Sequence, residues 1–208
     1  MTDETRRTHW DAAYRTKGEA GVSWFEDKPA VSLDLIRKYA PVRSSSLIDI
    51  GGGASRLVDT LLDEGANAVT VLDLSPAALE AARARLGARA GRVQWLAADV
   101  TVWTPDHAYD LWHDRAAFHF LTDPVDRAAY VERLTAAVKP GGYAIIATFA
   151  PDGPERCSGL PVVRYDAATL GRVIGPSFRL VEALRHDHQT PSKTLQAFQF
   201  SVWQRLSG

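Results

Sequence analysis

The sequence predicts an α/β fold in which helices cover both faces of a mostly parallel sheet. From residue 46 onward, short apolar runs alternate with longer amphipathic stretches, the pattern of repeated strand–helix units. With 208 residues, 46% of them hydrophobic and 24% charged, the chain has the size and composition of one globular domain. We therefore expect a single domain over residues 1–208 rather than two.

Five apolar runs are the expected strands. Each is short, rich in aliphatic or aromatic residues and bounded by turn-forming or charged residues, as buried strands of a parallel sheet are. The expected strands are Leu47–Ile50, Ala68–Leu72, Val93–Ala97, Tyr109–His113 and Tyr143–Phe149.

Helices are expected between these strands. Ser75 and Pro76 follow the second run and supply an N-cap and a first-turn proline. Asp123 and Pro124 open a helix in the same way after the fourth run. The segment Pro140–Gly142 is expected to end that helix before the fifth strand.

The two ends of the chain depart from this alternation. Residues 3–17 and 29–40 predict two helices outside any strand–helix unit, so residues 1–40 are expected to form a helical cover over a core at residues 45–150. Residues 151–208 predict a loop rich in Pro and Gly, a short helix and a closing hairpin. These last elements are expected at Ala167–Val173, Phe178–Arg185 and Leu195–Gln204.

Charge and cysteine content narrow the partners and the cellular setting. The 24 Lys and Arg residues nearly balance the 25 Asp and Glu residues, so the net charge of -1 gives no overall attraction to nucleic acid or anionic lipid. No apolar run approaches the roughly 20 residues of a membrane span, and the first residues lack the apolar core of a signal peptide. The single cysteine, Cys157, cannot form an internal disulfide. We expect a cytoplasmic protein without nucleic-acid or membrane partners.

Three consecutive glycines, Gly51, Gly52 and Gly53, follow the acidic residue Asp49 at the end of the first strand. Glycine permits a tight turn and lets a ligand approach main-chain N–H groups. A plain strand–helix turn is the alternative interpretation. A nicotinamide dinucleotide loop would have a further glycine at position 56, where this chain has Arg56, so the loop disfavours a nicotinamide cofactor.

Two further acidic residues follow the next two strands. Asp73 lies about 20 residues beyond the glycine loop, where nucleotide-binding α/β folds hold ribose hydroxyls. Asp99 follows the third strand, where its carboxylate can accept a hydrogen bond from an exocyclic amine. A solvated strand-end aspartate is the alternative for each. Because parallel strands end at one edge of the sheet, Asp49, Asp73 and Asp99 together predict an adenosine site.

Four segments resemble, in order, the successive motifs of class I S-adenosylmethionine-dependent methyltransferases. They span most of residues 45–150, and the family's D-x-G-x-G-x-G loop is matched at Asp49, Gly51 and Gly53, with Ser55 in place of the last glycine. The resemblance implies a Rossmann-like, seven-stranded, mostly parallel sheet with an antiparallel C-terminal hairpin, and S-adenosylmethionine as the cofactor. The segments are Asp49–Gly53, Val71–Ser75, Ala98–Val100 and Lys139–Tyr143.

The same resemblance implies a role for each motif. The glycine loop would hold the methionine part of the cofactor. Asp73 would hold the ribose and Asp99 the adenine amine, and their neighbours Leu74 and Val100 are also expected to bind the cofactor.

Two subfamily resemblances point to different acceptors. The segment Leu111–Phe118, expected beside the transferred methyl group, is similar to the W-D-R-[GA]-A stretch of thiopurine and related small-thiol methyltransferases. The runs His9–Tyr14 and Val22–Phe25 resemble the opening of elongation-factor lysine methyltransferases, although those enzymes usually carry D-K-G-T where this chain has Asp114–Ala117. The expected acceptor is therefore a sulfur or nitrogen atom of a small molecule or of a protein side chain.

Three residues after the fourth strand are candidates for catalysis. A sulfonium already makes its methyl group electrophilic, so alignment and exclusion of water matter most. Arg115 is expected to stabilise a thiolate or selenolate, whereas His113 or Asp114 would take the proton of an amine. A local ion pair between Asp114 and Arg115 is the alternative. If Arg115 faces the pocket, an anionic acceptor is favoured; if Asp114 and aromatic residues line it, a cationic amine is favoured.

Aromatic residues of the N-terminal cover are candidates for contact with the sulfonium. Trp24 is the foremost of them, because an aromatic ring face attracts a cation. The alternative is that these rings only pack the first helix against the sheet. The others are Trp10, Tyr14 and Phe25.

Two histidines and the cysteine are weighed as metal ligands. His186 and His188 alternate as strand residues on one side do, and Cys157 lies in a loop expected to border the acceptor pocket. These ligands are too few for a metal site, and none is expected.

Two other function classes are alternatives to a methyltransferase. They are a nicotinamide-dependent oxidoreductase and a non-catalytic adenosine-binding module.

Overall fold

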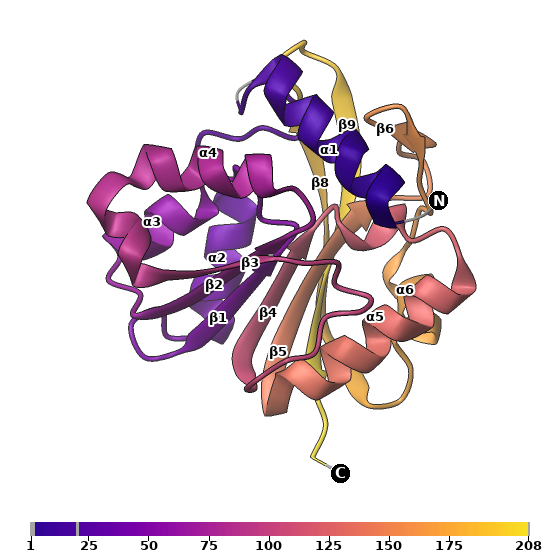
Figure 1. The fold of residues 1–208 in the computed structure, drawn as a ribbon. Coiled ribbons are helices and arrows are strands. Elements are labelled where there is room, and N and C mark those ends of the chain that lie inside the picture. Colours follow the sequence, from indigo (N-terminus) through magenta and orange to yellow (C-terminus); the bar gives the residue numbers. More distant parts are fainter. Residues whose placement is uncertain (1–2, 20, 208) are drawn as a thin grey trace.

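A seven-stranded sheet forms the centre of the molecule in the computed structural model, which describes residues 3–19 and 21–207 (Figure 1). The strand order is β3-β2-β1-β4-β5-β9-β8. The first five strands pair in parallel, whereas β9 is antiparallel to β5 and β8 is antiparallel to β9. The strands are β1 (Ser46–Ile50), β2 (Ala68–Asp73), β3 (Val93–Ala97), β4 (Tyr109–Arg115), β5 (Val138–Phe149), β8 (Phe178–Gln189) and β9 (Leu195–Arg205).

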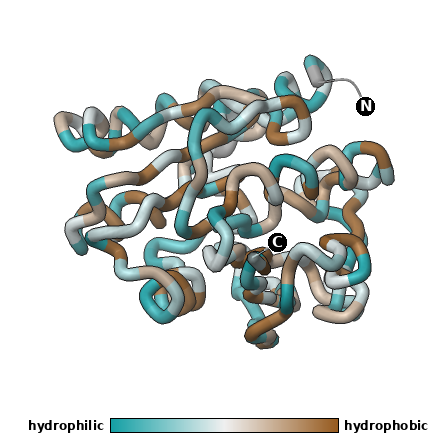
Figure 2. The backbone as a smooth tube through the Cα atoms, turned by 90° about the horizontal axis from the view of Figure 1, so that it is seen from below, coloured by the Kyte–Doolittle hydropathy of each residue, from teal (hydrophilic) through white to brown (hydrophobic). Residues whose placement is uncertain are grey.

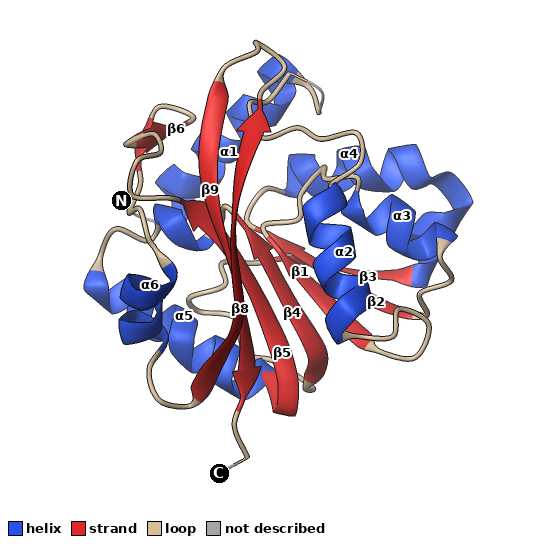
Figure 3. Ribbon diagram, turned by 180° about the vertical axis from the view of Figure 1, so that it is seen from behind, coloured by secondary structure: helices blue, strands red, loops and turns tan. Residues whose placement is uncertain are grey.

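Helices cover both faces of the sheet (Figures 1 and 3). One face packs against α2, α3 and α4 and the other against α5 and α6, and each layer encloses its own cluster of buried apolar side chains. Figure 2 shows hydrophobic and hydrophilic residues alternating along the helical coils, as expected for helices with one buried side. The helices are α2 (Ala30–Tyr39), α3 (Leu57–Asp63), α4 (Pro76–Leu86), α5 (Pro124–Ala137) and α6 (Ala167–Ile174).

The N-terminal helix α1 (Asp3–Lys17) lies across the carboxyl-terminal edge of the sheet (Figure 1). Asp11 of α1 accepts hydrogen bonds from the Ser75 hydroxyl, 2.5 Å away, and from the backbone N–H of Ala77, 3.2 Å away. These are groups at the start of α4, where free N–H donors and the helix dipole favour a carboxylate. Asp11 therefore fixes α1 over the strand ends.

Local signals in the sequence place two helix starts correctly. The Ser75 hydroxyl accepts a hydrogen bond from the Ala78 N–H at 3.1 Å, and Asp123 accepts one from Val125 at 2.8 Å, so both residues cap the helices that they precede. Short 3₁₀ helices at Gly87–Arg92 and Phe118–Phe120 complete the connections around β3 and β4.

The expected role of Pro140–Gly142 as the end of a helix is wrong. Helix α5 ends earlier, at Ala137, and the segment lies inside β5, at a shift in the register between β5 and β4. Proline lacks an N–H for the ladder, and a Cβ atom at Gly142 would lie 2.9 Å from the Asp110 carbonyl oxygen. The segment therefore interrupts the regular pairing of β5 with β4, at a place where glycine fits and a larger residue would not.

The C-terminal hairpin is longer than expected, and its first strand includes His186 and His188. The preceding loop contains a small two-stranded hairpin, β6 (Arg156–Cys157) with β7 (Leu160–Pro161), where no strand was expected. Among the described residues, no helix is both long and apolar enough to cross a membrane.

Candidate functional site

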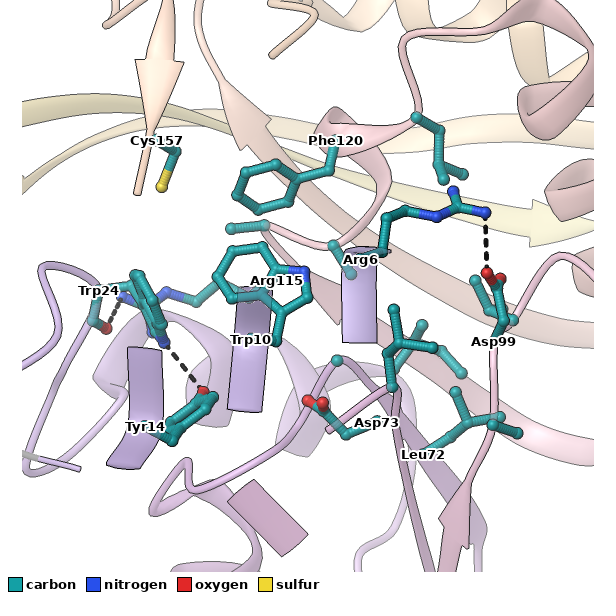
Figure 4. A pocket seen from close by; sticks show the side chains of 18 residues that line it. Arg6, Trp10, Tyr14, Trp24, Leu72, Asp73, Asp99, Arg115, Phe120 and Cys157 are labelled. Carbon is teal, nitrogen blue, oxygen red and sulfur yellow. Dashed lines mark hydrogen bonds and ion pairs between the residues drawn. The ribbon is translucent and has the colours of Figure 1, made fainter. Parts of the chain in front are cut away.

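A cavity of about 130 Å³ opens at the carboxyl-terminal edge of the sheet, beneath α1 (Figure 4). Its walls come from the ends of β1 to β4, from α1 and from the segment before α2, so residues far apart in the sequence meet there. Asp73 and Asp99 lie toward one end, and Arg115, Trp24 and Cys157 toward the other (Figure 4). This is the edge at which open α/β sheets bind ligands.

The loop after β1 depends on glycine. Gly51 and Gly53 have φ values of 65° and 42°, in the left-handed region that favours glycine. A Cβ atom on Gly52 would lie 2.5 Å from Oδ2 of Asp49, and one on Gly53 would lie 2.8 Å from Oδ2 of Asp73. Gly51 lines the cavity, while the other two glycines let the loop pack against the carboxylates behind it.

Asp73 is a buried carboxyl group in the cavity wall, beside Leu74. Its side chain accepts hydrogen bonds from the backbone N–H groups of Ser75, at 2.7 Å, and of Gly53. Burial, reinforced by the negative charges of Asp49 and Asp11, raises the pKa of Asp73 to about 7. A ligand that donated hydrogen bonds to this carboxylate would stabilise its charged form.

Asp99 occupies the corresponding position after β3, and Val100 lines the cavity beside it. Oδ1 of Asp99 accepts hydrogen bonds from the backbone N–H and the hydroxyl of Thr101, at 2.8 and 2.7 Å. Oδ2 lies 2.9 Å from Nη2 of Arg6, a residue of α1. Asp73 and Asp99 thus meet in one cavity as predicted, whereas Asp49 lies outside its lining, behind the glycine loop.

The three candidate catalytic residues of β4 do not meet in the cavity. His113 lies between Asp49 and Ser32, at 2.7 and 2.9 Å, and Asp114 lies on the opposite face of the sheet. Neither lines the cavity, so the structure does not bring these two candidate proton acceptors to it. The pleat of the strand turns Asp114 to the opposite face, whereas His113 lies on the same face as Arg115 but two residues earlier, where Asp49 and Ser32 hold it.

Asp114 instead fixes the turn that follows β4. It accepts hydrogen bonds from the N–H groups of Ala117 and Phe118, at 2.8 and 3.1 Å, and from the hydroxyl of Tyr130 at 2.7 Å. Burial raises the pKa of Asp114 to about 6, although these hydrogen bonds and the charge of His113 oppose the shift. Within the same turn, Ala116 has a φ of 71°, so the wall of the cavity holds a strained backbone.

Arg115 is the one of the three that lines the cavity. Its Nη2 atom lies 2.9 Å from Oε1 of Glu26 and donates to the carbonyl oxygen of Trp24 at 3.0 Å. The proposed local ion pair with Asp114 does not form, because each side chain has other partners. Burial lowers the pKa of Arg115, while Glu26, Asp49 and Cys157 act in the opposite direction.

Aromatic rings close the cavity on the side of α1. The ring of Trp10 makes edge-to-face contacts with Trp24 and Phe120, at centroid distances of 5.6 and 4.8 Å, and Trp24 donates a hydrogen bond to the Tyr14 hydroxyl at 3.4 Å (Figure 4). All four rings line the cavity, whereas Phe25 packs against the guanidinium of Arg56, 5.5 Å away. The rings of the aromatic cover therefore pack against one another and also line the cavity.

Sequence reasoning did not find Arg6 or Glu26. Neither belongs to a motif, and Arg6 reaches Asp99 only because α1 docks on α4. Cys157 lies where a loop bordering the pocket was expected, and it is buried in the cavity wall.

Known methyltransferases are similar to this chain in sequence. Residues 47–142 match the family model described as a methyltransferase domain. The chain is 34% identical over 185 residues to a trans-aconitate 2-methyltransferase of Methylobacterium radiotolerans, covering 81% of this chain and 65% of that protein. It is 28% identical over 144 residues to a trans-aconitate 2-methyltransferase of Rhizobium rhizogenes, covering 69% of this chain and 50% of that protein. The match thus spans between half and two thirds of these relatives.

A solved structure shows the same fold over nearly the full length. It is the 1,6-didemethyltoxoflavin-N1-methyltransferase of Burkholderia thailandensis with S-adenosylhomocysteine bound, with a TM-score of 0.77 and 20% identity, covering 100% of this chain and 92% of that chain. The family match over residues 47–142 covers the strands from β1 into β5, and the antiparallel strands β8 and β9 follow it in the chain. The chain therefore belongs to the class I S-adenosylmethionine-dependent methyltransferases.

Proposed function

We propose that this protein transfers a methyl group from S-adenosylmethionine to a carboxylate oxygen of a small organic acid. The observation that carries the proposal is the position of Arg115, whose side chain is 11% exposed and lies in the cavity wall, at the opposite end from Asp99 (Figure 4). A guanidinium matches a carboxylate in charge and in planar geometry. The names of the two relatives, both trans-aconitate 2-methyltransferases, support the same class of acceptor.

The other end of the cavity fits the cofactor. In our proposal, the carboxylate of Asp73 accepts hydrogen bonds from the ribose hydroxyls, with Leu74 beside them, and Asp99 accepts one from the adenine amine, with Val100 beside it. The loop Gly51–Gly53 leaves room for the methionine part, since a Cβ atom at Gly52 or Gly53 would crowd the carboxylates of Asp49 and Asp73. Trp24 would then lie against the sulfonium.

A carboxylate acceptor explains why the cavity holds no histidine among its described lining residues. S-adenosylmethionine supplies an electrophilic methyl group: the acceptor oxygen forms a C–O bond as the C–S bond breaks, the electron pair stays on sulfur, and no proton is transferred. Carboxylates are ionised at neutral pH, so the protein needs only to orient the acceptor and exclude water. A protonated amine, by contrast, would require a base at this end, and neither His113 nor Asp114 is there.

The proposal also includes the cellular location of the protein and the size class of its acceptor. We place the protein in the reducing cytoplasm, because its single cysteine, Cys157, cannot form an internal disulfide. Enclosure of the cavity by α1 and its aromatic rings suits a small molecule better than a protein lysine. The net charge of -1 gives no support to a nucleic-acid acceptor.

Product analysis tests the proposal. The purified protein is incubated with S-adenosylmethionine carrying a deuterated methyl group and with a small tricarboxylate (trans-aconitate), a dicarboxylate, an aromatic thiol or a primary amine. Mass spectrometry should detect a labelled, base-labile methyl ester from an acid. Label that appears only in a thioether or a methylamine would overturn the carboxylate assignment.

An Arg115 variant tests whether the guanidinium binds the acceptor. Arg115→Lys keeps the charge but loses the planar fork, so we expect the KM for the acid to rise about tenfold or more while the Kd for S-adenosylhomocysteine changes by less than about twofold. Arg164→Lys is the matched control, because Arg164 pairs with Glu155 outside the cavity. An equal loss of affinity for both ligands would assign Arg115 to the cofactor instead.

A further inference from the structure

One carboxylate oxygen behind the cavity is shared by two cationic side chains. Oε1 of Glu26 lies 2.9 Å from Nη2 of Arg115 and 3.0 Å from Nδ1 of His188. Glu26 comes from the segment before α2, Arg115 from the end of β4, and His188 from the end of the long strand β8. The closing hairpin therefore reaches the acceptor end of the cavity through His188, although His188 itself does not line the cavity.

The partners of His188 fix its proton count. Nε2 lies 2.8 Å from the carbonyl oxygen of Ser23, and Nδ1 faces the carboxylate of Glu26. A carbonyl oxygen and an ionised carboxylate can only accept hydrogen bonds, so both ring nitrogens must carry a proton to satisfy them. His188 is buried, and a neutral ring would turn one lone pair toward an oxygen without a proton between them. The geometry points to an imidazolium that donates from both ring nitrogens.

This proton count sets the charge at the acceptor end. Glu26 alone would neutralise Arg115, but Glu26 and the imidazolium of His188 cancel each other, so the three side chains together carry one positive charge. We propose that His188 is a positioning and specificity residue for the acceptor: it balances Glu26, so that the guanidinium of Arg115 acts on an acceptor carboxylate with its full charge. This inference rests on the proposed carboxylate acceptor.

The surroundings agree with this charge distribution. Burial by itself raises the pKa of Glu26, but the hydrogen bond from His188 and the positive charges of Arg115, His188 and His186 outweigh burial, and the pKa lies below its ordinary value. The charged and titratable groups that face the cluster are His186 on β8, Asp49 behind the glycine loop and Cys157 on β6. The ring of Phe198 on β9, with its centroid 6.2 Å from that of His188, covers the remaining side.

The protonation state of His188 is measured without any reaction. Nitrogen NMR of the protein labelled at histidine should show both ring nitrogens of His188 protonated at pH 7, with the signal assigned by its loss in His188→Gln. A neutral His188 at pH 7 in the wild-type protein would overturn the inference, whatever the acceptor proves to be.

Three variants separate charge from structure. His188→Gln leaves Glu26 to neutralise Arg115, so we expect the KM for the acid to rise about tenfold with little change in kcat. Adding Glu26→Gln to that variant removes the neutralising charge, and the KM should return to within about twofold of the wild-type value. His107→Gln is the control, because His107 is exposed and pairs with Asp106 away from the cavity, and the KM of this variant should change by less than about twofold.

The pattern of outcomes distinguishes the two proposals. If the wild-type protein methylates a thiol or amine rather than an acid, the carboxylate proposal fails, while the NMR result still decides the proton count of His188. If an acid is methylated but the double variant is as impaired as His188→Gln, His188 acts through folding alone and the inference fails. In the wild type, the KM for the acid should rise over the same pH interval in which NMR shows His188 losing its proton, and a flat KM there would also contradict it.

Discussion

Arg6 and Asp99 join helix α1 to the end of strand β3 through an ion pair of 2.9 Å between Nη2 and Oδ2. Arg6 also lies 3.1 Å from Asp126 on α5, so it bridges two carboxylates at the rim of the cavity. In our proposal Asp99 accepts a hydrogen bond from the adenine amine, and Arg6 competes for the same carboxylate. Helix α1 thus covers the end of the cavity proposed for S-adenosylmethionine, which we call the donor end. Its residue Arg6 also occupies the Asp99 carboxylate there.

Removal of Arg6 should therefore strengthen cofactor binding. We expect Arg6→Gln to lower the Kd for S-adenosylhomocysteine about two- to fivefold, the range of a partly exposed ion pair. Asp126→Asn is the control, because it removes the other partner of Arg6 and leaves the pair with Asp99 in place. Calorimetric titration of both variants measures the effect, and weaker binding by Arg6→Gln would show that Arg6 supports the cofactor rather than competing with it.

Asp73 should link cofactor affinity, stability and pH. Its folded-state pKa of about 7 lies above the ordinary value of 3.8, so its contribution to stability is fully present below about pH 4 and is lost as the pH rises through 7. Asp73→Asn removes this loss, and we expect the variant to gain about 2 kcal/mol relative to the wild type between pH 5 and pH 7 in urea unfolding. The same variant should bind S-adenosylhomocysteine at least about tenfold more weakly, because an amide is a poorer acceptor for ribose hydroxyls. Unchanged affinity would remove Asp73 from the cofactor site.

The glycine loop allows a test of crowding against backbone strain. Gly53 and Gly141 both have positive φ values, 42° and 80°, but a Cβ atom meets Asp73 and Tyr14 only at Gly53, while Gly141 has open space. We expect Gly141→Ala to cost about 1 kcal/mol of stability and to leave cofactor affinity unchanged. Gly53→Ala should cost more and weaken cofactor binding at least about tenfold. If the two variants bind the cofactor equally well, the loop does not support it in the way proposed.

Asp114 should prove structural rather than catalytic. Asp114→Asn disturbs three hydrogen bonds in a buried turn, and we expect it to lose about 2 kcal/mol of stability. At a temperature where the variant is folded, the pH dependence of kcat should match that of the wild type. If kcat of the variant lost a pH dependence that the wild type shows, Asp114 would be the proton acceptor.

Much of the donor end could be predicted because its signals are local. Three glycines and the acidic residues Asp73 and Asp99 mark strand ends, and parallel pairing brings strand ends together. The acceptor end depends on contacts between distant segments, such as that of Glu26 with His188, which no spacing encodes. Along β4 the motif suggested three catalytic residues, but the pleat turns Asp114 to the other face and Asp49 and Ser32 hold His113, so only Arg115 of the three lines the cavity.

The nature of the donor is tested most directly by calorimetric titration of the purified protein with S-adenosylmethionine, with NADH as the control nucleotide. We predict saturable binding of S-adenosylmethionine in the micromolar range, and no heat of binding for NADH, because position 56 of the loop is arginine and the cavity ends at Arg115 rather than extending to a second nucleotide. Binding of NADH without binding of S-adenosylmethionine would contradict the donor site described for this protein and leave only its fold in common with the methyltransferases.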